Sequence, residues 1–401
     1  MLFLLSPRCF PIAMVPMFAW ALAGWCYFHS HTAMAAEWYL APQISLRTAY
    51  DDNVLLVEDP EDSEVSATAT AFAAIGARAE DSDLNIKAGL SANRYSRQDQ
   101  LDYDEIYLEL SGFQEFTRSI ARLEGRVARD STLTGDIEGI LTHKRVDRET
   151  QSLNPSWDYR LSEWSFLSLG LAYTNTSYVE SDDVRLFDYD YWIVDSTISH
   201  QLNVQTRLLA LVALSRYQLK TVDAYTDSYL VKLGVIRDFS QSTRGDFWLG
   251  VRENKSVFGE GGAEVTDSGT DIMLDAKIKK RLEATTLTGS LGRSISPTGF
   301  GYLYLRDNIR VSVDHDMTPT LLAAMSVSAF RDEAAAGDAP DIGRDYFVFD
   351  TKLRRRVSPA WTVEAGYRYR WQKIRSTDQE ANSNTVFASV IYSLQQRIFT
   401  R

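Results

Sequence analysis

Apolar and polar residues alternate with a period of two along most of the chain after its first 35 residues. The clearest stretch covers residues 149–178. In its second half Leu167, Leu169 and Leu171 alternate with serine, glycine and alanine, and the Ser162-Glu163 pair separates it from a similar first half. This alternation predicts two strands with one apolar and one polar face, joined by a turn of about two residues. Both strands exceed the roughly five or six residues usual in globular proteins, and such a hairpin suits the crossing of a bilayer.

The same unit recurs to the end of the chain, with connections that are in turn short and long. The predicted strands are residues 38–53, 65–78, 84–96, 105–116, 120–130, the two in 149–178, 187–200, 205–220, 229–239, 245–252, 271–281, 285–295, 302–314, 320–331, 346–357, 361–375 and 383–394. We predict an all-β fold, a closed antiparallel transmembrane barrel of about eighteen strands with sixteen as the alternative, short periplasmic turns and long extracellular loops. An even number lets the first and last strands pair and leaves no free edge.

Three stretches depart from the simple pattern. Pro155 falls inside a predicted strand, where we expect a bulge because proline cannot donate to the ladder. The run from Arg207 to Leu214 is apolar on both faces, so one apolar face points inward, and we expect an internal loop or helix to pack there. Residues 253–268 are rich in glycine and acidic residues and are predicted to be a long connection.

Composition is compatible with a barrel and not with a helical membrane protein. The mean hydropathy is −0.23, and after the N-terminus the longest apolar run is Leu208 to Leu214, far short of the roughly twenty residues that a spanning helix needs. No change of composition divides residues 36–401, which we treat as one outer-membrane barrel domain.

The first 35 residues are predicted to be a Sec-type signal peptide. Residues 10–28 are apolar, Arg8 is the only Lys or Arg before Ala36, and Ala33-Met34-Ala35 is a small-x-small cleavage site. The alternative is a retained N-terminal anchor. Both cysteines, Cys9 and Cys26, lie in this segment, so cleavage leaves a mature chain without thiol chemistry.

Charge excludes one class of partner. The chain carries 42 Lys and Arg against 54 Asp and Glu, a net charge of −12. Removal of Arg8 leaves 41 against 54, a net charge of −13, which disfavours nucleic acid. We expect the outer membrane of a Gram-negative bacterium, with its lipid and lipopolysaccharide, as the surroundings of the barrel.

Charged side chains define the inner face of the barrel. An arginine that faces lipid near the middle of the bilayer costs roughly 2–4 kcal/mol, so the charged face of each strand is predicted to line the lumen. The pore-lining candidates are Arg47, Lys87, Arg122, Glu124, Arg126, Asp271, Asp275, Lys277, Lys279, Arg306, Arg310, Asp350, Lys352, Arg354, Glu364, Arg368 and Arg370. Tyr95, Tyr302, Tyr304 and Tyr346 are predicted on the same side, where they could stack against sugar rings. The alternative is that the inward charges only form ion-pair ladders that hydrate and stiffen the wall.

Aromatic residues near the strand ends are predicted to form the two interfacial girdles. The periplasmic set is Trp38, Tyr39, Trp164, Phe239, Trp248 and Trp361, and the outer set is Tyr178, Phe187, Phe258, Tyr302 and Trp371.

No strong catalytic or metal signature is present, so we predict neither an enzyme nor a cofactor. His143 with Asp136 or Asp147 in an outer loop is the only acid-histidine pair considered for a surface hydrolase. Asp51-Asp52-Asn53 and the acidic run that follows offer oxygen ligands without calcium-loop spacing, so a solvated acidic loop is the expected interpretation.

The segments TAYDDNVLLVEDPEDSE, LDYDEIYLELSGFQEFTRS, RDSTLTGDIEG and VDRETQSLNPSWDYRLSEWSFLSLGLAY resemble the β-barrel porins found with bacterial exopolysaccharide systems, some of them in PEP-CTERM and exosortase gene clusters. The resemblance is clearest over residues 36–178. It implies an outer-membrane barrel that exports or passes exopolysaccharide or another hydrophilic glycan, with periplasmic export components as partners. The alternative is a structural or adhesive barrel that acts through its extracellular loops.

Overall fold

The computed structural model describes residues 37–60, 63–134, 144–179, 186–260, 263–335, 343–394 and 397–399. The predicted signal peptide and its two cysteines lie outside these residues. The strands are β1 (Glu37–Asp51), β2 (Glu64–Arg78), β3 (Ser82–Tyr95), β4 (Tyr103–Glu115), β5 (Ser119–Ser131), β6 (Asp147–Arg160), β7 (Ser165–Tyr178), β8 (Tyr189–Asn203), β9 (Thr206–Leu219), β10 (Ala224–Ser240), β11 (Thr243–Glu260), β12 (Ala263–Arg281), β13 (Thr285–Pro297), β14 (Leu303–Thr318), β15 (Leu321–Ala334), β16 (Arg344–Arg356), β17 (Trp361–Ile374), β18 (Gln379–Ser393) and β19 (Arg397–Phe399). The short 3-10 helices η3 (Asp99–Leu101) and η4 (Thr132–Thr134) lie in connections. None of the helices in the described ranges is long and apolar enough to cross a membrane.

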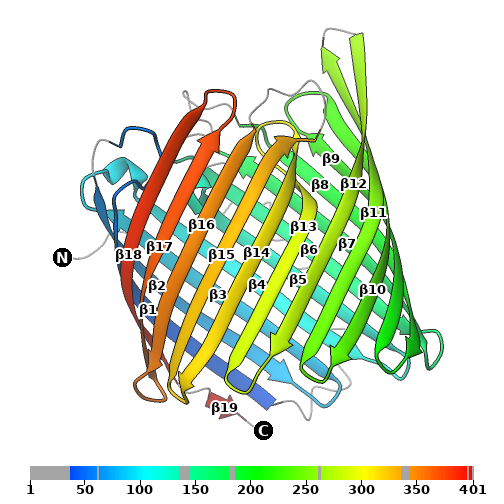
Figure 1. Ribbon diagram of the computed structural model, residues 1–401, viewed down its shortest axis with the longest axis horizontal. Coiled ribbons are helices and arrows are strands. Elements are labelled where there is room, and N and C mark those ends of the chain that lie inside the picture. The colour runs from blue at the N-terminus through cyan, green and yellow to red at the C-terminus, as the bar shows by residue number, and fades with distance from the viewer. Residues whose placement is uncertain are drawn as a thin grey trace.

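Eighteen of these strands close into a tilted cylinder (Figure 1). Each strand is antiparallel to its neighbours, and β1 also pairs with β18 from Gln43–Ser393 to Asp51–Thr385. β19 prolongs this closure along β1 at Trp38–Phe399. The predicted eighteen-stranded closed barrel is confirmed, and sixteen strands are excluded.

The two faces of the wall differ as the alternation predicted. On the outer face Leu46, Leu249 and Ile272 expose 61, 59 and 64% of their surface. Their neighbours on the inner face are charged or polar and bond across strands, as Lys87 does with Glu109. Apolar side chains this exposed are stable in lipid and not in water, so the outer face is the membrane face.

The two ends of the barrel also differ. At one end, called here the turn end, connections are short, such as residues 79–81 and 319–320. The opposite end, called the loop end, carries the longer connections, such as 179–188 and 335–343, and lies at the top of Figure 1. The predicted sorting is correct for the long connections, which all lie at the loop end, but this end also carries short ones at 220–223, 261–262 and 375–378.

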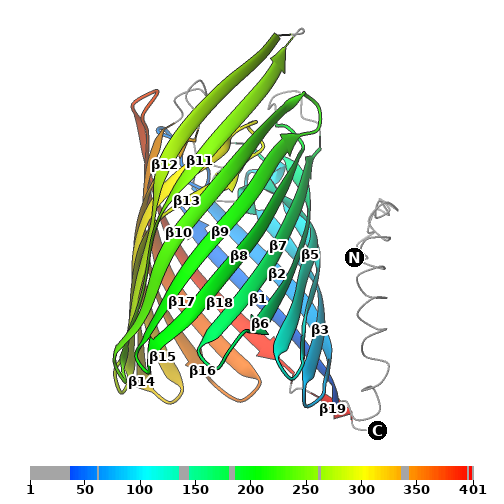
Figure 2. The ribbon, with the colours of Figure 1, turned by 90° about the vertical axis from the view of Figure 1, so that its right-hand side faces the viewer.

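The predicted long connection over residues 253–268 is wrong. β11 and β12 remain paired up to Glu260–Ala263, and their hairpin projects beyond the other strands (Figures 1 and 2). Both faces of a strand are wet outside the bilayer, so apolar alternation fades there although the backbone ladder continues.

The predicted bulge at Pro155 is also wrong. β6 and β7 keep one register from Leu153–Tyr173 to Ser156–Gly170 and only lack pairing between these points. On its other side Pro155 remains in register with Leu123 of β5. Proline removes one donor, and a local gap in one ladder accommodates that loss without an extra residue.

The predicted girdles are correct only in part. Trp38, Trp164 and Trp361 lie near the turn end with 48, 51 and 46% of their surface exposed. Tyr39 instead faces inward, where its hydroxyl accepts a hydrogen bond from the Asn85 amide at 2.7 Å. Trp248 also faces inward, because it lies opposite Asp275 on the inner face.

Candidate functional site

The inner wall of the barrel is built from ion pairs between neighbouring strands. Arg126 contacts both Glu105 (2.9 Å) and Glu109, and Arg122 contacts Asp158. On the opposite side of the lumen Arg368 lies 2.6 Å from Asp350. Further predicted pore-lining residues are paired in the same way: Lys87 with Glu109, Asp275 with Lys232, Arg306 with Asp332, Glu364 with Arg354, and Arg370 with Asp51. None of the seventeen charged candidates is buried.

Seven of the seventeen have no ion-pair partner within 4 Å among the described residues. They are Arg47, Glu124, Asp271, Lys277, Lys279, Arg310 and Lys352, five cations and two carboxylates. Lys277 and Arg310 both lie opposite Ser290 of β13, and Lys279 lies two residues further along β12 toward the turn end. Lys277, Lys279 and Arg310, called here the basic patch, therefore offer unpaired positive charge to a solute in the lumen.

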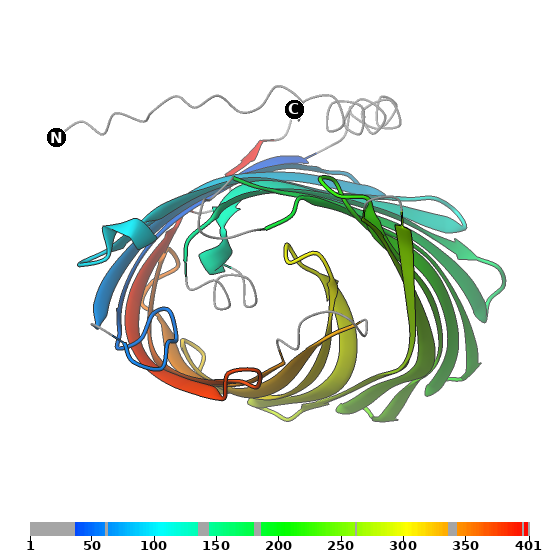
Figure 3. The ribbon, with the colours of Figure 1, turned by 90° about the horizontal axis from the view of Figure 1, so that it is seen from above.

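The loop ends of β13 and β14 leave the wall and enter the lumen. In Figure 3 this yellow part of the chain lies inside the ring of strands. We call residues 292–306 the flap. The Tyr217 hydroxyl of β9 donates to the Thr298 carbonyl at 2.6 Å, and the Phe187 amide donates to the Gly299 carbonyl at 2.7 Å. The flap thus contacts strands that are four and five positions away around the barrel, which narrows the lumen.

An apolar cluster fixes the flap in this place. Leu303 of the flap packs with Tyr189, Tyr217 and Leu219 on the inner face of β8 and β9. A side chain at Gly299 would displace the Tyr178 ring, which lies 2.6 Å from the position of its Cβ, and Gly301 has φ +93°, a conformation that favours glycine. The run 207–214 was expected to receive an internal loop or helix, but the flap packs instead on Tyr217 and Leu219, which lie beyond this run on the same face of β9.

Two other segments also enter from the loop end. After β1 the chain turns inward, Leu56 is fully buried, and its carbonyl accepts a hydrogen bond from the Gln372 amide at 2.7 Å. η4 lies inside the ring in Figure 3, where the Thr132 amide donates to the Val146 carbonyl at 2.9 Å. The described residues therefore narrow the lumen at the loop end.

A buried charge cluster connects the flap, through Arg306, to Asp332 of β15 and Arg344 of β16. Asp332 is 1% exposed and accepts bonds from Arg306 at 2.6 and 2.9 Å and from Arg344, which is fully buried, at 2.8 Å. The Arg344 guanidinium also lies 4.9 Å from the centre of the Tyr346 ring.

The tyrosines predicted to stack against sugars lie in different surroundings. Tyr302, Tyr304 and Tyr346 are 9, 0 and 5% exposed, so other side chains cover them in this structure. Tyr95 is half-buried and keeps part of its surface toward the lumen. Sugar stacking remains a prediction, and Tyr95 is the residue placed to test it.

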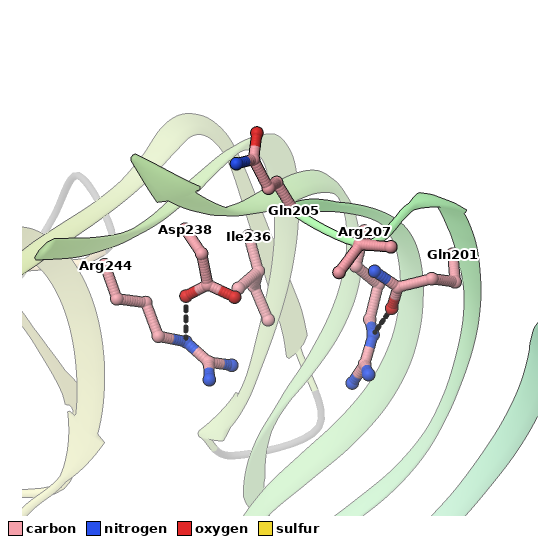
Figure 4. A pocket seen from close by; sticks show the side chains of 7 residues that line it. Gln201, Gln205, Arg207, Ile236, Asp238 and Arg244 are labelled. Carbon is pink, nitrogen blue, oxygen red and sulfur yellow. Dashed lines mark hydrogen bonds and ion pairs between the residues drawn. The ribbon is translucent and has the colours of Figure 1, made fainter. Parts of the chain in front are cut away.

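A pocket near the turn end is lined by residues of β8, β9, β10 and β11 and of the turn at residues 204–205 (Figure 4). The Arg207 guanidinium donates to Gln201 at 3.0 Å, and Arg244 lies 4.0 Å from Asp238. Ile236 adds a small apolar surface between these pairs.

The structure describes only some of the residues that the sequence offered for catalysis or metal binding. Asp136 and His143 lie outside the described residues. His200 and His315 are at the turn end, within 2.9 Å of Ser165 and 2.8 Å of Thr285. Asp51 accepts bonds from Arg370, Ser383 and Thr385, so protein donors already occupy its oxygens. The described part of the chain contains no group of three potential metal ligands.

The flap is the functional feature that the sequence did not place. Its β13 and β14 segments carry ordinary strand alternation and give no sign of leaving the wall. The apolar inward face of residues 207–214 predicted internal packing on this strand, but the flap contacts Tyr217 and Leu219, which lie outside that run.

The comparison with known families agrees with this architecture. Residues 33–394 match the family described as "Putative beta-barrel porin 2". The chain belongs to this family. It is therefore a porin-like β-barrel channel of the Gram-negative outer membrane, and by the usual asymmetry of such barrels its turn end faces the periplasm. This membership bears out the resemblance to β-barrel porins.

Similar solved structures are outer-membrane proteins of low sequence identity. Pseudomonas aeruginosa OccK7 (OpdD) is 10% identical, with a TM-score of 0.48 over 90% of this chain and 98% of its own. Pseudomonas aeruginosa OccK3 (OpdO) is 13% identical, with a TM-score of 0.47 over 92% and 98%. Acinetobacter baumannii OccAB3 is 10% identical, with a TM-score of 0.46 over 89% and 99%. No curated protein sequence matches the chain.

Proposed function

We propose that this porin passes a hydrophilic glycan, such as an exopolysaccharide, across the outer membrane. The observation that carries the proposal is the inner wall, on which all seventeen charged candidates keep some accessible surface. Ion pairs between strands offer donors and acceptors to sugar hydroxyls along the whole height of the wall. The resemblance to exopolysaccharide-associated porins supports the same substrate class, with export components in the periplasm as partners.

Uptake and surface measurements test this proposal. Liposomes that contain the purified barrel are expected to admit neutral oligosaccharides up to a size limit, and a deletion strain is expected to lose surface polysaccharide. Complementation with the intact gene is expected to restore it. Liposomes impermeable to every oligosaccharide, together with unchanged surface polysaccharide in the deletion strain, would refute the proposal.

The basic patch predicts a preference for anions. Replacing Lys277, Lys279 and Arg310 by glutamine is expected to lower the anion-to-cation permeability ratio by about twofold or more, because rings of cations in a pore favour anions. The reversal potential in a salt gradient measures this ratio. The effect is expected to grow at low ionic strength, since the screening length is about 10 Å at 0.1 M salt.

A matched control removes the same charge from the other face of the wall. Lys255, Lys280 and Arg355 lie on the outer face and are exposed. Their replacement by glutamine is expected to leave the reversal potential unchanged. Equal shifts in both triple variants would mean that the patch has no direct role in selectivity.

A second candidate function is adhesion through the loop end. The observation in its favour is the β11–β12 hairpin, which projects beyond the rest of the barrel (Figure 2). Replacing residues 259–264 by an Asn-Gly turn closes β11 and β12 at the Phe258–Val265 pair and is expected to leave channel conductance intact. If cells with this variant lose surface attachment and keep their polysaccharide, adhesion is the better account.

A further inference from the structure

The barrel wall is interrupted between β12 and β13. Their pairing runs only from Arg281–Thr286 to Asp275–Gly292, which is the part nearest the turn end. On its other side β12 stays paired with β11 as far as Ala263–Glu260. In the described residues β12 therefore has no strand partner on the β13 side beyond Asp275. We call this interruption the seam.

The seam begins where the flap turns inward. Beyond Gly292, β13 remains paired with β14 but not with β12. The apolar side chains on the outer side of the flap, Ile295 and Leu303, then pack on the inner face of β8 and β9. Unpaired backbone groups at membrane depth are costly, so the flap gives up ladder bonds with β12 and gains the apolar contacts.

The sequence of the flap is also compatible with continued pairing to β12 in the barrel wall. If the β12–β13 register continued beyond Asp275–Gly292, Ile272 would lie opposite Ile295. Ile295 is already opposite Leu305, and Ile272 is already opposite Val251 on its other side. Val251 and Ile272 are 51 and 64% exposed on the outer face. The paired flap would therefore complete an apolar row of four side chains toward the lipid.

One ion pair disfavours an arrangement in which the flap pairs with β12 in the wall. Arg293 and Asp307 form a bidentate pair at 2.5 and 2.6 Å on the outer side of the flap. In the continued register Arg293 would lie opposite Leu274, which is 41% exposed on the outer face. A charged pair toward lipid is unfavourable, and this stabilises the inward position of the flap.

We propose that the flap is a gate with two positions. In the inward position it narrows the lumen and leaves the seam open. In the wall position it pairs with β12, closes the seam and widens the lumen. In the inward position the apolar face of the flap packs on β8 and β9, and in the wall position the same face meets lipid. Both surroundings suit apolar side chains, which is the condition for two packings of similar free energy. The proposal does not depend on which solute the channel passes.

A cysteine pair across the seam tests the wall position. Cys9 and Cys26 are replaced by serine, and Ile272→Cys is combined with Ile295→Cys. Oxidation of the folded barrel is expected to link the pair and to raise single-channel conductance, and reduction is expected to reverse both changes. The matched control is Ile278→Cys with Gly289→Cys, which are paired in the intact ladder and face the same side. A Cβ at Gly289 meets no atom within 4 Å, so this control is expected to link with no change of conductance.

The outcomes are decisive. If the control pair links and the Ile272–Ile295 pair does not, the flap never reaches the wall and the proposal fails. If the seam pair links while conductance stays at the level of the reduced protein, the flap does not gate the lumen and the proposal also fails.

A variant that lacks the Arg293–Asp307 ion pair tests the equilibrium between the two flap positions without cysteines. Arg293→Leu combined with Asp307→Leu is expected to favour the wall position and to increase the fraction of time at high conductance. The control is Arg216→Leu with Asp227→Leu, a bidentate outer-face pair at 2.6 and 2.7 Å on β9 and β10. Equal behaviour of the two variants in single-channel recordings would contradict the proposal.

Discussion

Replacing residues 297–303 by an Asn-Gly turn is expected to raise single-channel conductance by about twofold or more, because conductance follows the narrowest cross-section of a pore. The substitution removes the tip of the flap and closes β13 and β14 at the Ser296–Tyr304 pair with a turn suited to two-residue hairpins. Thr298 and Gly299 then no longer bond to Tyr217 and Phe187. Recordings in planar bilayers measure the change.

The control for this variant removes a similar length of chain elsewhere at the loop end. Replacement of residues 259–264 by Asn-Gly closes β11 and β12 at the Phe258–Val265 pair and shortens the hairpin that projects beyond the other strands (Figures 1 and 2). Its conductance is expected to equal that of the intact protein. Unchanged conductance after removal of residues 297–303 would show that the flap is not the narrowest part of the lumen.

Asp332→Ala is expected to destabilise the barrel by about 3–5 kcal/mol, the usual cost of leaving buried cations without their counter-ion. Asp332 holds Arg306 and Arg344, and Arg344 has no exposed surface to which it can turn for water. Denaturant-induced unfolding of the detergent- or lipid-bound barrel measures this difference.

Asp350→Ala is the matched control, because Asp350 also pairs with an arginine of the inner wall. The side chains of Arg368 and Asp350 are 45 and 33% exposed, and exposed pairs contribute about 0–1 kcal/mol. Similar losses of unfolding free energy in both variants would show that the burial of the Asp332 cluster does not increase its contribution to stability. Asp332→Asn keeps the shape and is expected to lose part of the stability only.

The alternation of the chain was sufficient to predict the barrel. A strand that faces lipid on one side and water on the other must carry its apolar residues at every second position, so the positions of Leu46 and Leu249 in the alternation already marked the outer face. The same rule assigned the paired charges, such as Arg368 with Asp350 and Arg354 with Glu364, to one face. The energetic cost of charge in lipid left a single choice for which face that was.

The alternation of apolar and polar residues gave wrong predictions where both faces of a strand have similar surroundings. Residues 253–268 extend a hairpin into water and resemble a loop in the sequence. Tyr39 and Trp248 lie near strand ends, where aromatic character alone does not show which face they occupy. In each case the backbone pairing, which leaves no residue pattern of its own, decided the structure.

The sequence by itself determined a closed barrel with an apolar outer face and a charged inner face, because the period of two and the cost of charge in lipid are local properties of each strand. Only the tertiary structure showed that Leu303 meets Tyr217, that β12 and β13 separate beyond Asp275, and that Asp332 and Arg344 are buried. These features depend on contacts between segments more than eighty residues apart along the chain, or on the bending of several strands together. Strand alternation is the same whether a strand end stays in the wall or turns into the lumen, so no local pattern distinguishes the two.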